Sequence, residues 1–163
     1  QKAEKAREAG QCMGEALPEL RDIMHKIKET YDVHKSNVGV GSTIFAVKPG
    51  DGSAREQAAS CQKVLGGWAN IANEYATKRY RSNLINWGML PFIIDKGELP
   101  FENGDYIFIP EIQDAIKNKV STIKAFVVNK DMKEFELKLD ELTDDERQII
   151  LDGCLINYYR ENK

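Results

Sequence analysis

The stretch "GDGSAREQAAS" at residues 50–60 is the part of the sequence whose residue types could do chemistry. Gly50 and Gly52 allow the backbone to approach a bound molecule closely. The first amides of a following helix lack partners within that helix and, together with its dipole, attract negative charge. Arg55 offers a planar fork that matches a carboxylate. Ser53 is placed where these groups favour its alkoxide, so it could take a proton beside a substrate carboxylate.

A purely structural interpretation of the same residues is also open. Ser53-Ala54-Arg55-Glu56 matches a capping box, with Ser53 as the N-cap and Glu56 at the third helical position. Such a cap stabilises a helix by ~1 kcal/mol and requires no ligand. No phosphate-loop lysine follows the glycines, and the chain has no GxGxxG pattern. The residues alone therefore leave both a substrate site and a capped helix start possible.

The elements that must position this loop are predicted from hydrophobic spacing and turn residues. A strand is predicted over 37–47, a loop over 48–52 and a helix over 53–65. Further strands are predicted over residues 68–75, 89–94, 105–109, 122–129 and 134–139, the last two forming a hairpin. Further helices are predicted over residues 1–9, 17–31, 78–87 and 143–159, and a short helix or turn over 112–119. Thr77 is the predicted cap of the helix over 78–87, and Thr143 to Glu146 match a capping box.

This alternation of strands and helices predicts an α/β domain of layered type. The length of 163 residues suits one domain. We divide it into a helical N-terminal segment, residues 1–36, and a core, residues 37–163.

The composition argues against several classes of function. A net charge of −3 and a pI near 5.5 make a nucleic-acid partner unlikely by charge. No apolar run approaches ~18 residues, so no membrane span is predicted. The first residues, "QKAEKAREAG", have no apolar signal core and no initiator Met, so we expect the chain to begin inside a longer protein or to be processed. Lys78, Arg79 and Arg81 are interpreted as a solvated helix face rather than an anion pocket or an RNA contact.

The three cysteines, Cys12, Cys61 and Cys154, form no CxxC pair. They predict neither a zinc site nor a disulfide framework but buried thiols in a reducing compartment, which indicates a cytoplasmic protein. Cys61 is expected to be packed rather than to bind a metal. His25 and His34 are expected on the surface.

Two motifs in register resemble the aconitase family. "GDGSAREQAA" is similar to that family's Gly-acid-Gly-Ser-Ser-Arg-Glu-His-Ala-Ala signature, and "NLINWGMLP" at residues 83–91 resembles its Asn-Leu…Gly-Leu-Leu-Pro stretch. The segment 145–163 resembles the family's closing helix, and "KAREAG" at residues 5–10 is a weaker anchor. The likeness spans roughly residues 50–163.

The resemblance implies the swivelling C-terminal domain of that family, a three-layer β/β/α arrangement with a mixed sheet and flanking helices. It implies that Ser53 is the catalytic base, that Arg55 binds substrate carboxylate, and that Gly52 and Ala54 belong to the substrate-binding loop. Ala54 stands where the family has a second serine, and Gln57 where it has a histidine. These departures, with those at residues 42–52 and 11–36, imply a divergent hydratase.

The implied function is a hydro-lyase that adds or removes water on a small di- or tricarboxylic hydroxy acid. The family's 4Fe-4S cluster is held by domains absent from this chain, so no metal site is expected here and the domain alone is expected to be inactive. The expected partners are the carboxylic acid substrate and either the remaining domains of the same protein or a large subunit. Two alternatives stay open: a non-catalytic binding or interaction domain, which Ala54 favours, and a stand-alone small subunit of an isopropylmalate dehydratase-like enzyme.

Overall fold

The computed structural model describes residues 1–34 and 36–161, and the last two residues of the segment 145–163 lie outside the described part. The chain forms two compact units. Unit 1 consists of Gln1–Gly41, Glu98–Ile109 and Ala125–Phe135, and unit 2 of Ser42–Gly97, Pro110–Lys124 and Glu136–Lys163. The sequence-based division into one domain with a helical segment at 1–36 stays a prediction.

Unit 1 is built around three helices of the N-terminal region. These are α1 (Lys2–Glu8), α2 (Met13–Ala16) and α3 (Glu19–Thr30), which Pro18 precedes. Leu20, Ile23 and Ile27 recur at helical spacing along α3 and are buried together with Val128. Tyr31 packs edge-on against Phe108, with ring centroids 5.3 Å apart. The predicted helices over residues 1–9 and 17–31 are confirmed.

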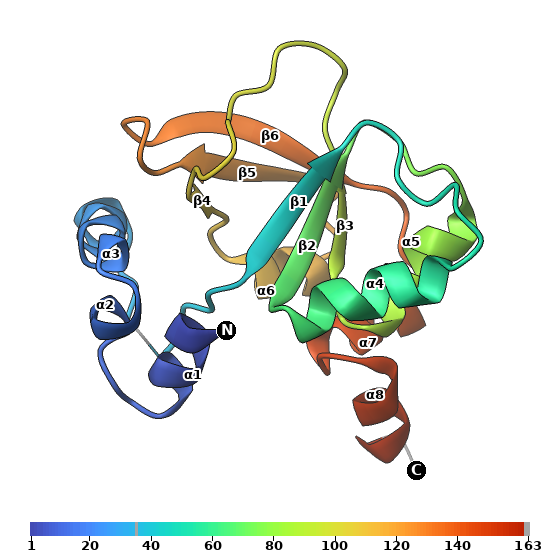
Figure 1. Cartoon of the computed structure of the whole chain (residues 1–163), viewed down its shortest axis with the longest axis horizontal. Helices are drawn as coiled ribbons and strands as arrows, with labels where there is room; N and C mark the ends of the chain where they lie inside the picture. Colours follow the sequence, from blue (N-terminus) through green and yellow to red (C-terminus); the bar gives the residue numbers. More distant parts are fainter. Residues whose placement is uncertain (35, 162–163) are drawn as a thin grey trace. The chain divides into compact units, whose positions relative to one another are not determined.

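Unit 2 contains three parallel strands joined by helices (Figure 1). In chain order these are β1 (Ser42–Ala46), α4 (Arg55–Val64), β2 (Gly67–Ala72), α5 (Lys78–Asn86) and β3 (Leu90–Ile93). They are followed by α6 (Ile112–Lys117), α7 (Asp144–Leu151) and α8 (Leu155–Glu161). Helices α4 and α5 pack on each other, α4 contacts β2, and α5 contacts β3 and α7. This packing buries Ile71 and Phe92 on the strands and Leu84 on α5.

The remaining strands are β4 (Ile107–Phe108), β5 (Thr122–Val127) and β6 (Lys133–Leu139). The strands are hydrogen-bonded in the order β1-β2-β3-β6-β5-β4, with β3–β6 and β4–β5 antiparallel. The sheet is therefore mixed and has flanking helices, which confirms the predicted α/β fold class. The predicted hairpin is confirmed as the neighbours β5 and β6, whereas the strand predicted over 105–109 is reduced to two residues.

The prediction of one final helix over residues 143–159 is wrong in one respect. Thr143 and Glu146 form the predicted capping box, but the helix ends at Leu151 and α8 begins only at Leu155. Gly153 lies between them at φ +88°, a left-handed conformation that an α-helix cannot contain. Its carbonyl group packs directly against the α carbon of Gly88, where a side chain would overlap the carbonyl oxygen. A contact distant in sequence therefore accompanies the helix break.

The Gly88→Ala substitution is expected to destabilise the protein. Gly88 has a φ of +69°, and a methyl group would collide with backbone atoms of Gly153 rather than with a movable side chain. Left-handed strain alone costs about 1–3 kcal/mol, so we expect the free energy of unfolding in urea to fall by at least that amount. Gly52→Ala is the control, because nothing lies within 4 Å of its added carbon. Equal stability of both variants would contradict the Gly88–Gly153 contact.

Candidate active site

The loop between β1 and α4 is fixed by the chain segment that leads from β2 to α5. The amide of Ala76 donates to the carbonyl of Pro49 at 2.9 Å. The Thr77 hydroxyl, which also accepts from the Tyr80 amide as the predicted cap of α5, donates to the carbonyl of Gly50 at 3.3 Å. These contacts hold the start of the signature loop at the carboxyl ends of β1 and β2, where open α/β sheets bind ligands.

Lys48 is engaged before the loop begins. Its ammonium group lies 3.0 Å from the carboxylate of Glu74, and this hydrogen bond lowers the pKa of Glu74 below its ordinary value. Both side chains are about half exposed, so the pair contributes little to stability. The amide of Glu74 also donates to the carbonyl of Val47 at 3.1 Å. Lys48 is thus paired with a carboxylate of the protein itself. Arg55 is the cation of the signature loop that could bind a substrate carboxylate.

Helix α4 begins at Arg55 rather than at Ser53, so the predicted capping box at this helix is wrong. Ala54 is the N-cap residue, with φ −87° and ψ 52°, and no side chain caps the helix. The N-cap is therefore one residue later than predicted, and Ser53 lies outside the helix and does not cap it. The Ser53 side chain is exposed. The backbone amides of the first turn of α4 therefore receive no hydrogen bond from a capping side chain.

Arg55 carries an unsatisfied donor at the start of α4. Its Nε atom is buried, yet it has no hydrogen-bond partner among the described residues. A buried donor without a partner costs about 1–3 kcal/mol. The Nε atoms of Arg81 and Arg147 are also buried and unpaired, so this state alone does not mark a ligand site. At Arg55, which opens the helix, an incoming carboxylate would supply the missing acceptor. The structure therefore brings Gly52, Ser53, Ala54 and Arg55 together at one exposed helix start, as the spacing predicted.

Beneath the loop, the partly buried Tyr75 and the buried Tyr80 were not singled out by the sequence analysis. Tyr75 donates from its hydroxyl to the carbonyl of Phe92 at 2.9 Å, and burial raises its pKa well above the ordinary value. Tyr75 is therefore a neutral donor rather than a base. Tyr80 of α5 is 2% exposed and contacts Gly50. The spacing of Tyr80 and Leu84 is that of a buried helix face, but spacing alone does not say which loop such a face touches.

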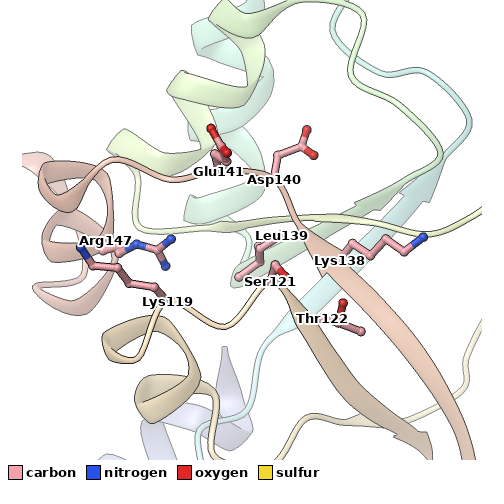
Figure 2. Close-up of a pocket in the computed structure, with 8 residues that line it drawn as sticks. All are labelled: Lys119, Ser121, Thr122, Lys138, Leu139, Asp140, Glu141 and Arg147. Atoms are coloured by element: carbon pink, nitrogen blue, oxygen red, sulfur yellow. The ribbon is translucent and has the colours of Figure 1, made fainter.

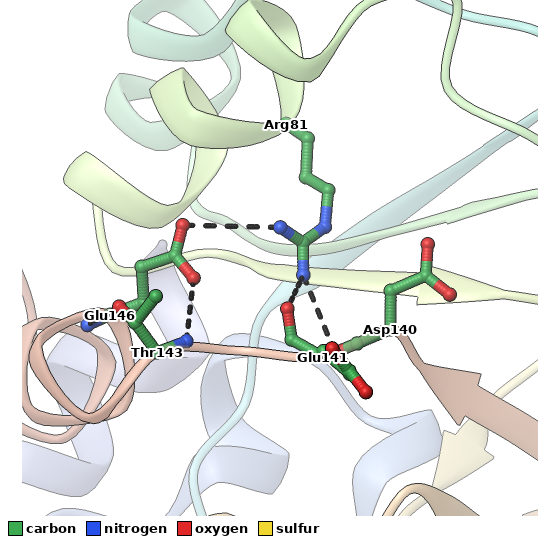
Figure 3. A network of polar contacts seen from close by, with 5 residues as sticks. All are labelled: Arg81, Asp140, Glu141, Thr143 and Glu146. Atoms are coloured by element: carbon green, nitrogen blue, oxygen red, sulfur yellow. Dashed lines mark hydrogen bonds and ion pairs between the residues drawn. The ribbon is translucent and has the colours of Figure 1, made fainter.

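Arg81 is not part of a solvated helix face, so that prediction is wrong for this residue, although Lys78 and Arg79 are exposed. The Arg81 side chain is 15% exposed and lies 3.9 Å from the carboxylate of Glu146. Figure 3 shows its guanidinium group donating to the backbone carbonyls of Asp140 and Glu141, at 3.3 and 3.1 Å. The residue ties α5 to the segment that precedes α7, which is a structural role.

Replacing Arg81 by glutamine is expected to lower the free energy of unfolding by about 1–3 kcal/mol, because two backbone carbonyls lose their charged donor. Arg79→Gln is the matched control and should stay within about 0.5 kcal/mol, since Arg79 is exposed on the same helix. Urea unfolding of both variants measures the difference. A loss shared equally by the two would show that the Arg81 contacts contribute nothing specific.

One pocket of unit 2 lies away from the signature loop. It has a volume of about 480 Å³ and is lined by the residues drawn in Figure 2, which are Lys119, Ser121, Thr122, Lys138, Leu139, Asp140, Glu141 and Arg147. Leu139 pairs with Phe92, and the chain then runs toward the amino end of β3, opposite the end where the loop lies. Its cations already have protein partners: Lys119 binds Asp144, Lys138 binds Asp95, and Arg147 donates to the carbonyl of Ile116. We assign no ligand to it.

The cysteines do not behave as predicted. Cys12 and Cys61 are exposed and Cys154 is half-buried, so the expectation of buried thiols is wrong. On α4 only Ala59 is buried, and Cys61, two residues further, points about 200° around the helix. His25 and His34 are exposed, as predicted.

Within residues 1–34 and 36–161, no three or more histidine, cysteine, aspartate or glutamate side chains are grouped so that they could hold a metal ion. The described residues therefore do not fit an iron–sulfur cluster. None of the helices in this part of the chain has both the length and the apolar character needed to cross a membrane.

Comparison with known families identifies the class of protein that this fold and loop define. A family model of the aconitase C-terminal domain matches residues 14–97, a range that contains the whole signature loop and α4. Because the match covers just over half of the chain, the chain belongs to the aconitase C-terminal domain family. The predicted resemblance is thereby confirmed.

The relatives place the chain beside two kinds of protein. Aconitate hydratase A of Rickettsia bellii is 30% identical over 156 residues, which are 91% of this chain and 17% of that protein. The methanogen homoaconitase small subunit of Methanocaldococcus jannaschii is 35% identical over 116 residues, which are 70% of this chain and 58% of that protein. The crystal structure of a 3-isopropylmalate dehydratase from the same organism superposes with a TM-score of 0.58 at 27% identity, covering 90% of this chain and 83% of that one. The chain thus spans less than two thirds of the curated relatives that it matches.

Proposed function

We propose that this chain is the swivel domain of a hydro-lyase that adds or removes water on a small di- or tricarboxylic hydroxy acid. One observation carries the proposal: the family signature lies at a helix start that no side chain caps, and Arg55 is the first residue of that helix. A helix start of this kind attracts anions, and a guanidinium group binds a carboxylate through two parallel hydrogen bonds.

Ser53, as its alkoxide, is the proposed base. It takes the proton from the carbon next to a substrate carboxylate, and Arg55 holds that carboxylate in place. The hydroxyl on the neighbouring carbon would leave with the help of the Lewis acid that the family's 4Fe-4S cluster supplies from outside this chain. The open amides at the start of α4 stabilise the negative charge that develops. Gly52 leaves room for the ligand, since nothing lies within 4 Å of the position where a side chain would begin. Ala54 offers only its backbone and a methyl group, so one hydroxyl contact of the family signature is missing.

The 4Fe-4S cluster of the family would have to be bound outside the described residues, because these offer no ligand group. No step of the proposal runs through this chain's own cysteines. We therefore propose that the domain alone is inactive and that the site is completed by the remaining domains of the same cytoplasmic protein or by a large subunit.

A second candidate is a separate small subunit of an isopropylmalate dehydratase-like enzyme. Its support is the superposition over 83% of the 3-isopropylmalate dehydratase chain. Purification from the native organism distinguishes the two, because a small subunit co-purifies with a second polypeptide whereas a swivel domain migrates as part of one larger chain. A non-catalytic binding domain of the same fold is the outcome if neither form turns over any acid.

The test is hydratase activity of the native protein, with all its domains or subunits and its cluster reconstituted anaerobically. A panel of hydroxy and unsaturated di- and tricarboxylic acids is assayed for hydration and dehydration. Turnover of at least one acid supports the proposal. Absence of turnover on every acid, in a folded and cluster-loaded protein, would overturn it in favour of the binding-domain alternative.

A further inference from the structure

We propose that Tyr80 is a positioning residue of this active site, which sets the distance between the Ser53 loop and the start of α4. The inference rests on the proposed function and extends it to a residue that never touches substrate. Tyr80 lies on α5, outside the signature motif, and is 2% exposed.

The inner end of the Tyr80 side chain supports the loop. Gly50 has a φ of +97°, and a carbon added to it would lie 2.5 Å from both Cβ and Cγ of Tyr80. The loop backbone therefore packs directly against the base of this side chain, and position 50 has no room for any side chain. Gly50 is anchored at the same place by the Thr77 hydroxyl at 3.3 Å. Because Gly50 precedes Ser53 by three residues, its position limits where Ser53 can lie.

The outer end of the same side chain holds α4. The Tyr80 hydroxyl accepts a hydrogen bond from the side-chain amide of Gln62 at 3.0 Å and another from the side-chain amide of Asn70 at 2.8 Å. Gln62 lies in the last turn of α4, seven residues after Arg55, so this bond acts on Arg55 only through the helix. Asn70 belongs to β2 and is 1% exposed. The bond from Asn70 is buried and fixes the Tyr80 hydroxyl, and the bond from Gln62 is partly buried.

The rigid ring of Tyr80 therefore contacts both segments of the site: the loop that carries Ser53, the proposed base, and the helix that carries Arg55, the residue proposed to bind the substrate carboxylate. Without the hydroxyl, α4 loses its hydrogen bond to α5 while the Gly50 contact remains. Arg55 can then shift relative to Ser53, and a misplacement of about 1 Å can cost about 100-fold in rate.

The experiment compares Tyr80→Phe with Tyr75→Phe in the native, cluster-loaded protein. Both substitutions remove the hydroxyl of a mostly buried tyrosine, but the Tyr75 hydroxyl bonds backbone carbonyls of Phe92 and Asn70 and not α4. We expect kcat/KM to fall about tenfold or more in Tyr80→Phe, mainly through kcat, while Tyr75→Phe stays within about twofold. Urea unfolding is measured alongside and is expected to show similar losses of stability in both.

Gln62→Met removes the same hydrogen bond from the α4 side and keeps the ring, so it carries the test if Tyr80→Phe fails to fold. It is expected to lower kcat in the same direction. Equal activity losses in Tyr80→Phe and Tyr75→Phe, or wild-type kcat in both Tyr80→Phe and Gln62→Met, would overturn the inference. Failure of the proposed function is distinguishable, because it appears as absent turnover in the unmodified protein.

Discussion

Ser53→Ala is expected to lower kcat by about 100- to 10,000-fold, the range that a positioned general base contributes. The same substitution should change the free energy of unfolding by less than about 0.5 kcal/mol. The reason is that α4 begins at Arg55 and receives no side-chain cap, so the exposed Ser53 hydroxyl supports no helix. The loss of this hydroxyl is thus predicted to lower kcat strongly and to leave stability nearly unchanged.

Steady-state kinetics and urea unfolding of the native, cluster-loaded protein check this result. Ser60→Ala is the matched control, since Ser60 lies on the helix that follows Ser53 and its hydroxyl donates to the carbonyl of Gln57. The control should keep its kcat. A Ser53→Ala protein that keeps its kcat but loses about 1 kcal/mol of stability would instead make Ser53 a helix cap, and the proposed base would have to be abandoned.

Arg55→Lys is expected to lower kcat/KM by about 10- to 100-fold, mostly as an increase in KM. Lysine keeps the positive charge but loses the planar fork, and a hydrogen bond between charged groups contributes about 1.5–3 kcal/mol. The substitution also removes the Nε atom of Arg55, which is buried and has no hydrogen-bond partner among the described residues. The effect therefore measures how much of the carboxylate affinity depends on geometry rather than on charge.

The measurement is kcat and KM on the best substrate of the panel, with Arg79→Lys as the control. Arg79 is exposed on α5, so its exchange should leave both constants unchanged. An unchanged KM in Arg55→Lys would show that Arg55 does not hold the substrate. A loss of stability without a change in kinetics would make the residue a packing element of α4.

The elements around the loop could be predicted because their signals are local. The glycines of the loop and the Thr77 cap act within a few residues, and Thr77 caps α5 as predicted. The strand predicted over 37–47 is right in place but wrong in its start, because only Ser42–Ala46 pairs as β1. The site residues Gly52 to Arg55 are also adjacent in sequence, so any fold that forms the loop brings them together.

What could not be predicted depends on contacts between distant residues. Ser53 matches a helix cap by local pattern, but the hydrogen bonds that anchor Pro49 and Gly50 move the helix start to Arg55. In sequence, nothing distinguishes Arg81 from its exposed neighbours. It is fixed by hydrogen bonds to the carbonyls of Asp140 and Glu141, which lie about sixty residues later in the chain. The helix predicted through residue 159 breaks at Gly153, whose contact is Gly88.

The contact between Gly88 and Gly153 also has a consequence for synthesis on the ribosome. Strand β3 ends at Ile93, but its neighbour β6 begins at Lys133 and Gly153 comes later still. At about 5–20 residues per second, several seconds of translation separate the appearance of these partners. During that interval β3 is an apolar strand with an open edge, the kind of segment that pairs with other nascent chains. The edge of β3 is therefore covered only when β6 is synthesised, after most of the helices have been made.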